Sequence, residues 1–253
     1  MKFLTDLWVL FKRNIRASLR NKVWLFIGLF QPILYLLLFA PLLKGLANVP
    51  GFPQGGPYTV FTPGLLVMVA IFSTAYVGFG LVSEIRYGVI ERMMVTPTRR
   101  LALLLGFVLR DIVVLLLQSL VVIAIAIPLG LAVNPLGLLA TLGMMVLTGA
   151  LMASFSYALA LRVKEENSLA SVLNLLSAPL LLLSGITLPL TLAPAVIQAI
   201  ALANPFAYEV TGARSLFIGN FNNSAILIGV AYLTLLAGLS FFWAARSFRK
   251  GTA

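Results

Sequence analysis

Long uncharged runs alternate with short charged segments along this chain. A membrane-spanning helix needs about 20 predominantly apolar residues, and each of the uncharged runs provides at least that length. Between the charged or Pro/Gly-rich breaks, the pattern predicts six spans, at approximately residues 23–43, 58–83, 101–130, 137–161, 168–188 and 222–245. We therefore expect an all-α integral membrane protein with a single transmembrane domain over residues 1–253.

Proline and glycine, instead of charge, divide two of the apolar regions. Residues 112–161 carry no charge and are too long for one span, but the sequence IPLGLAVNPLG at 127–137 predicts a tight reversal. Residues 189–214 are also apolar, and their prolines would interrupt a straight helix. They predict short re-entrant helices in the outer leaflet, between the fifth and sixth spans.

The first 22 residues have the 3.6-residue period of an amphipathic helix. Leu4, Trp8 and Phe11 share one face, whereas Lys12 and Arg16 lie largely on the other. A basic amphipathic helix of this kind suits the membrane interface, although packing on a soluble partner would produce the same pattern. Because charged residues interrupt the apolar positions, we expect no signal peptide and a cytoplasmic N-terminus.

Composition agrees with a membrane protein. Hydrophobic residues make up 61% of the chain and charged residues 10%, whereas soluble domains have about 45–50% and about 25%. The 18 basic and 7 acidic residues leave a net charge of +11. Such an excess suggests nucleic acid in a soluble protein, but in a membrane protein it reflects the enrichment of Lys and Arg in cytoplasmic loops.

The positions of the basic residues distinguish these two explanations. With the N-terminus inside, fifteen of the 18 lie on the cytoplasmic side, Lys44 and Arg214 lie outside, and Arg110 lies within the third span. This asymmetry places both termini in the cytoplasm. Since the basic residues form no single stripe, we expect no nucleic-acid partner.

Several chemistries are missing from the sequence. The chain has no cysteine and no histidine, which excludes disulfides, thiolate metal sites and imidazole bases. It contains no Gly-Lys pair and therefore no phosphate-binding G-x-x-x-x-G-K-[ST] loop. We expect no catalytic residue, no metal and no cofactor on this chain.

Arg110 and Asp111 are the ionisable residues that fall inside a predicted span. Intramembrane charges often mark a functional site. Alternatively, Arg110 extends toward the cytoplasmic headgroups and Asp111 pairs with a neighbouring residue. The sequence leaves both explanations open.

Charge is concentrated in one internal segment, SEIRYGVIERMMVTPTRR, at residues 83–100. It holds six of the 25 charged residues. The helical spacing of Glu84, Gly88 and Glu91 predicts a short helix that extends the second span into the cytoplasm and could present both carboxylates to a basic groove on a soluble protein. A solvated loop whose arginines contact lipid phosphate would have the same composition, and both interpretations stay open.

Three separate stretches resemble the ABC-2 permease family, which comprises the membrane subunits of ATP-binding-cassette exporters of the second type. These are QPILYLLLFAPLL in the first span, EIRYGVIERMMVTPTRRLALLLGFVLRD around the charged segment, and SGITLPLTLAPAVIQAIALANPFAYEVTGAR before the sixth span. Their order and spacing cover most of the chain. The family often has a basic residue directly after the glycine that matches Gly106, where this chain has Phe107.

The resemblance implies roles for two groups of residues. A cytoplasmic coupling helix within 84–100 would receive force from a separate ATPase, through Glu84, Arg86, Tyr87, Gly88, Glu91, Arg92, Thr96, Pro97, Arg99 and Arg100. Outer re-entrant helices within 189–214 would shape the exit of the substrate path, through Pro189, Pro194, Asn204, Pro205, Tyr208 and Arg214.

The resemblance also implies partners and a location. ATP and Mg²⁺ would bind to two copies of a cytoplasmic ATP-binding-cassette ATPase, and a second permease subunit, either a second copy or a paralogue, would complete the path. The protein would lie in a bacterial or archaeal plasma (inner) membrane, in contact with lipid.

The leading hypothesis is thus the permease subunit of an ATP-driven exporter. An apolar path with few fixed charges suits an amphiphile such as a drug, a lipid or a lipid-linked glycan, and the sequence does not distinguish these. Two alternatives remain: a secondary carrier or channel driven by an ion gradient, and a membrane scaffold that binds a partner without transporting a substrate.

Overall fold

The protein is a bundle of helices. The computed structural model describes residues 2–20, 22–42, 56–90, 100–187 and 190–250, and all regular secondary structure in these ranges is helical. The elements are α1 (Lys2–Arg20), α2 (Lys22–Leu42), α3 (Gly56–Ala75), α4 (Gly78–Arg86), α6 (Arg100–Ala126), α7 (Pro135–Val163), α8 (Glu166–Leu182), the 3₁₀ turn η2 (Leu190–Leu192), α9 (Ala195–Ala201), α10 (Pro205–Phe217) and α11 (Ser224–Lys250). The all-α class expected from the sequence is confirmed.

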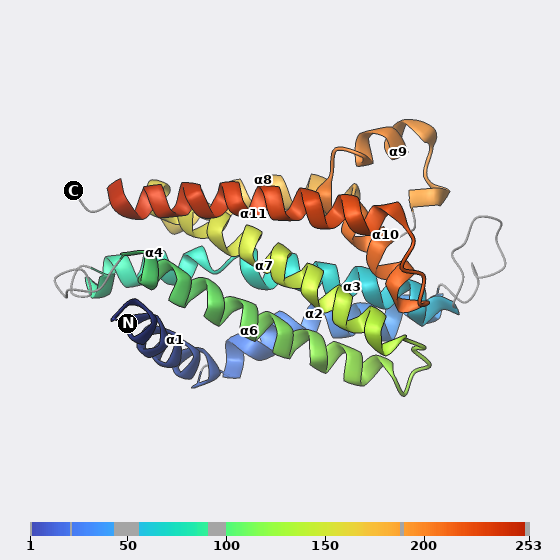
Figure 1. Ribbon diagram of the computed structural model, residues 1–253, viewed down its shortest axis with the longest axis horizontal. Coiled ribbons are helices and arrows are strands. Elements are labelled where there is room, and N and C mark those ends of the chain that lie inside the picture. The colour runs from blue at the N-terminus through green and yellow to red at the C-terminus, as the bar shows by residue number, and fades with distance from the viewer. Residues whose placement is uncertain (1, 21, 43–55, 91–99, 188–189, 251–253) are drawn as a thin grey trace.

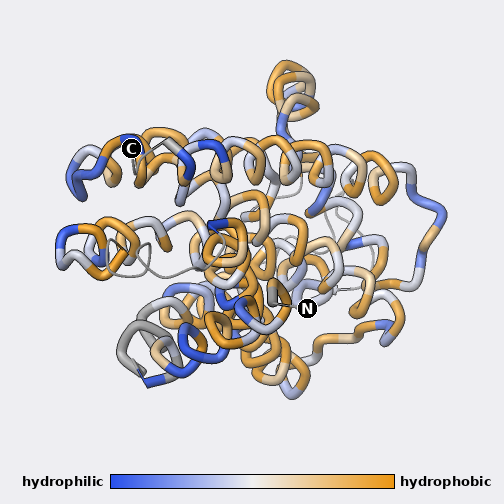
Figure 2. The backbone as a smooth tube through the Cα atoms, turned by 60° about the vertical axis from the view of Figure 1, so that its left-hand side comes forward, coloured by the Kyte–Doolittle hydropathy of each residue, from blue (hydrophilic) through white to orange (hydrophobic). Residues whose placement is uncertain are grey.

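Within the described residues, four helical segments are long and apolar enough to cross a membrane. They are Gly56–Arg86, Arg100–Ala126, Pro135–Val163 and Ser224–Arg249, and they overlap the predicted second, third, fourth and sixth spans. The long helices run alongside one another down the long axis of the molecule (Figure 1). Hydrophobic residues follow them along their length, and hydrophilic residues gather toward their ends and on α1 (Figure 2).

The predicted first span corresponds to α2, which has 21 residues, and the predicted fifth span corresponds to the shorter α8. Within α2, the apolar stretch in the described part covers Gly28–Phe39. Helix α8 has 17 residues and ends at Leu182, where the chain turns through Gly185 with a φ of 73°. The count of six spans therefore remains a prediction.

Two Asn-Pro pairs start helices on the side of the bundle opposite the end of α4. Asn134 precedes α7, and its side-chain oxygen accepts hydrogen bonds from the amides of Leu136 and Gly137 at 3.0 and 3.2 Å. Asn204 precedes α10 in the same way and accepts from the Phe206 amide at 3.1 Å. Asn supplies the acceptor that the first helical turn lacks, and Pro, which has no amide hydrogen, fits the next position.

Helix α7 lies at the centre of the bundle and packs on α3, α6, α10 and α11. Small residues let the backbones approach closely, as is common in membrane helices. At Gly137 an added Cβ would lie 1.8 Å from the Leu216 carbonyl oxygen, so only glycine fits where α7 begins beside the end of α10.

Helix α1 packs against α6, where Leu10 is buried beside Gly106. The predicted apolar face is only partly covered by this contact, since Leu4 and Trp8 are 69% and 62% exposed. An apolar face left uncovered beside a bundle of membrane helices is the arrangement expected of a helix in the membrane interface.

Candidate functional site at the two ends of the bundle

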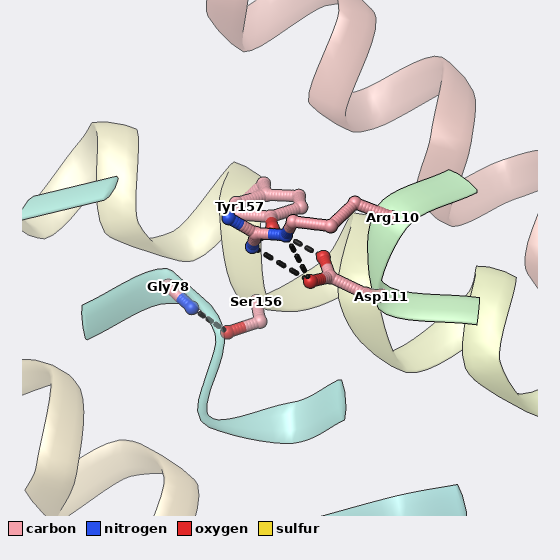
Figure 3. Close-up of polar contacts among 5 residues, drawn as sticks. All are labelled: Gly78, Arg110, Asp111, Ser156 and Tyr157. Atoms are coloured by element: carbon pink, nitrogen blue, oxygen red, sulfur yellow. Dashed lines mark hydrogen bonds and ion pairs between the residues drawn. The ribbon is translucent and has the colours of Figure 1, made fainter. Parts of the chain in front are cut away.

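A buried polar cluster joins α6 to α7. The Arg110 Nε donates a hydrogen bond to Asp111 Oδ1 at 2.8 Å, and a terminal guanidinium nitrogen donates to the Tyr157 hydroxyl at 2.9 Å. The Tyr157 hydroxyl in turn donates to Asp111 Oδ2. The three side chains converge between the helices (Figure 3).

The cluster faces the interior of the protein. Asp111 is 5% exposed and Tyr157 is 1% exposed, and the Arg110 guanidinium also lies 5.5 Å from the centre of the Phe107 ring. Arg110 follows Arg100 by ten residues, which is about 15 Å along the helix at 1.5 Å per residue. Asp111 therefore pairs with its neighbours, and Arg110 turns into the bundle instead of extending to the headgroups.

The second predicted span is interrupted next to this cluster. Helix α3 ends at Ala75 and α4 begins at Gly78, whereas the sequence predicts one continuous helix over 58–83. The Ser156 hydroxyl donates to the Ala75 carbonyl. It also accepts from the Gly78 amide at 2.9 Å (Figure 3). Ser156 thus satisfies backbone groups that the interruption leaves free, which is how membrane helices tolerate a break.

Gly78 is required at this interruption for steric reasons. A Cβ added there would lie 2.6 Å from Ser156 Oγ and 2.8 Å from the Ser156 carbonyl oxygen. Because Ser156 and Tyr157 are adjacent, the break before α4 and the polar cluster share one turn of α7. A displacement of α4 would therefore act directly on the contact between α6 and α7.

Part of the predicted coupling segment follows α4. Tyr87 is 73% exposed, Gly88 has a φ of 67°, and Arg86 forms an exposed ion pair with Glu166 at 3.7 Å. Glu84 behaves differently, because its Oε2 atom is buried and has no hydrogen-bond partner among the described residues. Among the described residues after Ser83, Arg86 and Tyr87 are thus better placed than Glu84 to meet a soluble partner.

The rest of the predicted coupling segment lies partly within the described residues and partly outside them. Arg100 begins α6 and donates a hydrogen bond to the Arg249 carbonyl at 2.9 Å. Glu91, Arg92, Thr96, Pro97 and Arg99 lie outside the described residues.

The predicted exit segment forms short helices at the opposite end of the bundle, where α9 stands away from the other helices (Figure 1). Pro194 precedes α9, Asn204 lies between α9 and α10, and Pro205 is the first residue of α10. The Asn204 amide also donates to the Leu180 carbonyl at 2.8 Å, which ties α10 to the end of α8. Pro189 lies outside the described residues.

Aromatic and basic residues of α10 fix its position. The Tyr208 ring lies 6.5 Å from the Tyr232 ring of α11. Arg214 donates to the Val60 carbonyl at 2.8 Å and to the Gly185 carbonyl at 2.8 Å, so one guanidinium connects α10, α3 and the turn after α8.

Sequence reasoning missed another buried polar contact of α10. The Thr148 hydroxyl of α7 donates to Glu209 Oε2 at 2.6 Å, and Glu209 is fully buried. Tyr157 and Ser156 were also missed. A polar side chain inside an apolar run is a weak signal by itself, because only the packing of two helices shows which residues face each other.

The described residues contain no group of three or more Asp, Glu, Cys or His side chains close enough to hold a metal ion. The geometry is that of helices connected by buried polar contacts, with exposed charge at one end.

Comparison with known proteins identifies the family. Residues 5–218 match the family model described as ABC-2 type transporter. The chain is similar to ycf38 of Cyanophora paradoxa, described as a transport permease, with 27% identity over 217 residues that cover 85% of this chain and 75% of the relative. It is similar to the daunorubicin resistance ABC transporter permease protein DrrB1 of Streptomyces coeruleorubidus, with 28% identity over 225 residues and the same coverage. Because the family model matches most of its length, the chain belongs to the ABC-2 type transporter family.

Proposed function

We propose that this chain is the permease subunit of an ATP-driven exporter and forms, with a second permease subunit, the path of an amphiphilic substrate. The observation that carries the proposal is the family match over residues 5–218, and the similarity to a drug-resistance permease supports it. A drug, a lipid or a lipid-linked glycan would each be compatible with the apolar helices.

In this proposal a separate ATPase supplies the energy. The sequence lacks a phosphate-binding G-x-x-x-x-G-K-[ST] loop, so ATP and Mg²⁺ would be bound by a cytoplasmic ATP-binding-cassette subunit, in two copies per complex. Six helices form a thin wall for a conduit, which favours a dimer of permease subunits, either identical or paralogous.

The proposed topology has six spans and two cytoplasmic termini, in a plasma (inner) membrane. The start of α1, the end of α4 and the end of α11 all lie at one end of the molecule (Figure 1), which supports an even number of crossings. Basic residues such as Arg86, Arg100 and Arg249 lie at that end, and the positive-inside rule makes it the cytoplasmic one.

The ATPase would dock at the end of α4 and on the segment after it. Exposed Tyr87 and Arg86 offer an aromatic and a cationic contact, and the break at Gly78 gives α4 a boundary at which it can move relative to α3. At the other end of the bundle, α9 and α10 would shape the exit. Asn204, between these two helices, is hydrogen-bonded to the end of α8, and Arg214 of α10 is hydrogen-bonded to α3 and to the turn after α8.

Transport in proteoliposomes tests this function. The chain would be co-purified with a candidate ATP-binding-cassette ATPase and assayed with a panel of fluorescent amphiphiles that includes daunorubicin. We expect transport that requires Mg-ATP and disappears when the Walker A lysine of the ATPase is replaced. Transport by the chain alone under a proton gradient would instead favour the secondary carrier. An ATPase rate that is unchanged by this chain would favour the scaffold.

A further inference from the structure

One acidic side chain lies deep among apolar residues, at the contact between α10 and α7. Glu209 of α10 is fully buried, and so is Thr148 of α7. The Thr148 hydroxyl donates a hydrogen bond to Glu209 Oε2 at 2.6 Å. The other carboxyl oxygen, Oε1, is buried and has no hydrogen-bond partner in the part of the chain that the structure describes. A single neutral hydroxyl is thus the described partner of this carboxyl.

The residues around this contact are hydrophobic. Met144 lies one turn before Thr148 on α7, Phe206 and Val210 flank Glu209 on α10, and all three belong to the hydrophobic core. A carboxylate in such surroundings loses the water that stabilises its charge, and one hydroxyl does not replace that water. A buried acid without a compensating charge therefore favours its neutral, protonated form.

No cation among the described residues pairs with Glu209. Helix α10 packs on α3, α7 and α11, and α3 contains no basic residue. Arg214 of α10 itself donates to the carbonyls of Val60 and Gly185. The other basic residues of these helices stand within the last five positions of α7 and α11, about 20 Å or more along the helix axes from this contact, and they are Arg162, Arg246, Arg249 and Lys250.

The tyrosines of the same helices do not supply a positive charge, because a tyrosine side chain is neutral or negative. The Tyr157 hydroxyl donates to Asp111, and the Tyr232 hydroxyl donates to the Ala203 carbonyl. The remaining tyrosines of α3 and α10 are Tyr58 and Tyr208, and α3, α7 and α11 contain no acidic residue. Every titratable side chain on the helices around Glu209 is thus accounted for, and none offsets a carboxylate there.

We infer that Glu209 is a proton-binding site, which carries a proton while α10 packs on α7 and releases it when α10 separates from α7. The O–H bond forms between a carboxylate oxygen and a proton from water, and on separation that proton returns to water. No other group is oxidised, reduced or transferred. The protonation itself is independent of the proposed function.

The direction of the pH effect follows from the burial of Glu209. Only the separated conformation lets water solvate the charge, so the contact between α7 and α10 is favoured at low pH and weakened as the pH rises. The consequence for transport rests on the proposed role of α10 at the exit. In that role, an acidic exterior would hold the exit closed.

Infrared difference spectroscopy of the purified chain in lipid nanodiscs tests the protonation. A protonated carboxyl group has a C=O stretching band that the ionised form lacks, and the chain has only 7 acidic residues to contribute one. A solvated glutamate titrates at about 4.3 and is ionised at about pH 7. We expect a band at about pH 7 that Glu209→Gln removes. Glu165→Gln, which alters an exposed glutamate in the same way, is the matched control and should leave the band in place.

Thiol labelling tests the link to movement of α10. Ala213 lies one turn after Glu209 and is fully buried, so in this cysteine-free chain Ala213→Cys should react with a thiol reagent only when α10 separates. Dividing its rate by that of Asn220→Cys, at an exposed position, removes the pH dependence of the thiol itself. The ratio should rise by up to about tenfold per pH unit once Glu209 ionises, because one proton is released.

Two neutral substitutions provide the comparison for the labelling experiment. Glu209→Gln keeps the shape of the protonated acid, and Glu209→Met keeps its length without a polar group. Neither residue can release a proton, so both variants should give a labelling ratio that does not change with pH. The second variant keeps the test decisive if the first one folds poorly.

Three results would overturn the inference. A band at about pH 7 that survives Glu209→Gln would mean that Glu209 is ionised there. A labelling ratio that is independent of pH in the chain that retains Glu209, or the same rise in both neutral variants, would separate proton release from the movement of α10. Since neither measurement uses an ATPase, a negative result here leaves ATP-dependent transport untouched, and a failure of transport leaves the proton-binding result interpretable.

Discussion

Replacing Asp111 by alanine should destabilise the protein much more than breaking an exposed ion pair. Asp111 accepts hydrogen bonds from Arg110 and Tyr157, and it is 5% exposed. In the Asp111→Ala variant the guanidinium keeps its charge in a site that is largely closed to water. The exposed pair of Arg86 and Glu166 provides the internal comparison.

The expected losses of unfolding free energy in the two variants, Asp111→Ala and Glu166→Ala, differ several-fold. Removing one partner of a buried ion pair costs about 3–5 kcal/mol, because the remaining charge is uncompensated. At 3.7 Å, and with side chains 63% and 43% exposed, the Arg86–Glu166 pair belongs to the class worth about 0–1 kcal/mol. Asp111→Ala should therefore exceed Glu166→Ala by at least about 2 kcal/mol.

A double variant distinguishes the cost of an unpaired buried charge from the cost of lost side-chain packing. Arg110→Leu combined with Asp111→Leu removes both charges and keeps apolar volume, and replacing a buried pair in this way is often neutral or stabilising. The double variant should thus recover most of the stability that Asp111→Ala loses. Tyr157→Phe, which removes only a hydroxyl, should cost about 0.6–2 kcal/mol, within the range for membrane hydrogen bonds.

Reversible unfolding by sodium dodecyl sulfate in mixed micelles, followed by circular dichroism, gives the free energies of unfolding. Equal costs for Asp111→Ala and Glu166→Ala would refute the reasoning, since they would mean that Arg110 is hydrated once its partner is removed. If the double variant does not recover stability, the cluster stabilises the protein through side-chain packing and not through charge pairing.

Other expectations can be checked with single substitutions. Gly78→Ala should lower the unfolding temperature, because its Cβ would lie 2.6 Å from Ser156 Oγ, whereas Gly80→Ala, with nothing within 4 Å, should be neutral or slightly stabilising. Glu91→Lys should leave insertion unchanged but abolish substrate-stimulated ATPase activity, and export at the unmodified rate would assign the segment to lipid anchoring. In this cysteine-free chain, a cysteine at Asn220 should react with an impermeant reagent outside intact cells and one at Thr98 should not. Reaction of the Thr98 variant from outside would invert the proposed topology.

Much of the architecture could be read from hydrophobic patterning. A backbone in lipid must satisfy its own hydrogen bonds, so uncharged runs of sufficient length become helices whatever their neighbours are. For this reason the predicted second, third, fourth and sixth spans overlap the four long apolar helices. The Asn-Pro pairs before α7 and α10 are equally local, since capping involves residues only two or three positions apart.

The partners in the buried polar contacts could not be predicted from local sequence. Arg110 and Asp111 stood out in the sequence because they interrupt an apolar run, but their third partner, Tyr157, is 46 residues beyond Asp111. Nothing in the sequence around Tyr157 distinguishes it from an aromatic residue that faces lipid. The same holds for Thr148 and Glu209, which are 61 residues apart.

The sequence by itself determined the class of the protein, the position of its long helices and the segments in which charge and proline gather, because burial in a bilayer and helix capping act over a few residues. Only the tertiary structure decided that the second span breaks at Gly78 and that Ser156 bridges the break. It likewise decided that Glu209 of α10 is buried against Thr148 of α7. These features arise where helices distant in sequence pack together, and the rotation of each helix about its axis, which sets the residues that meet, is fixed by that packing.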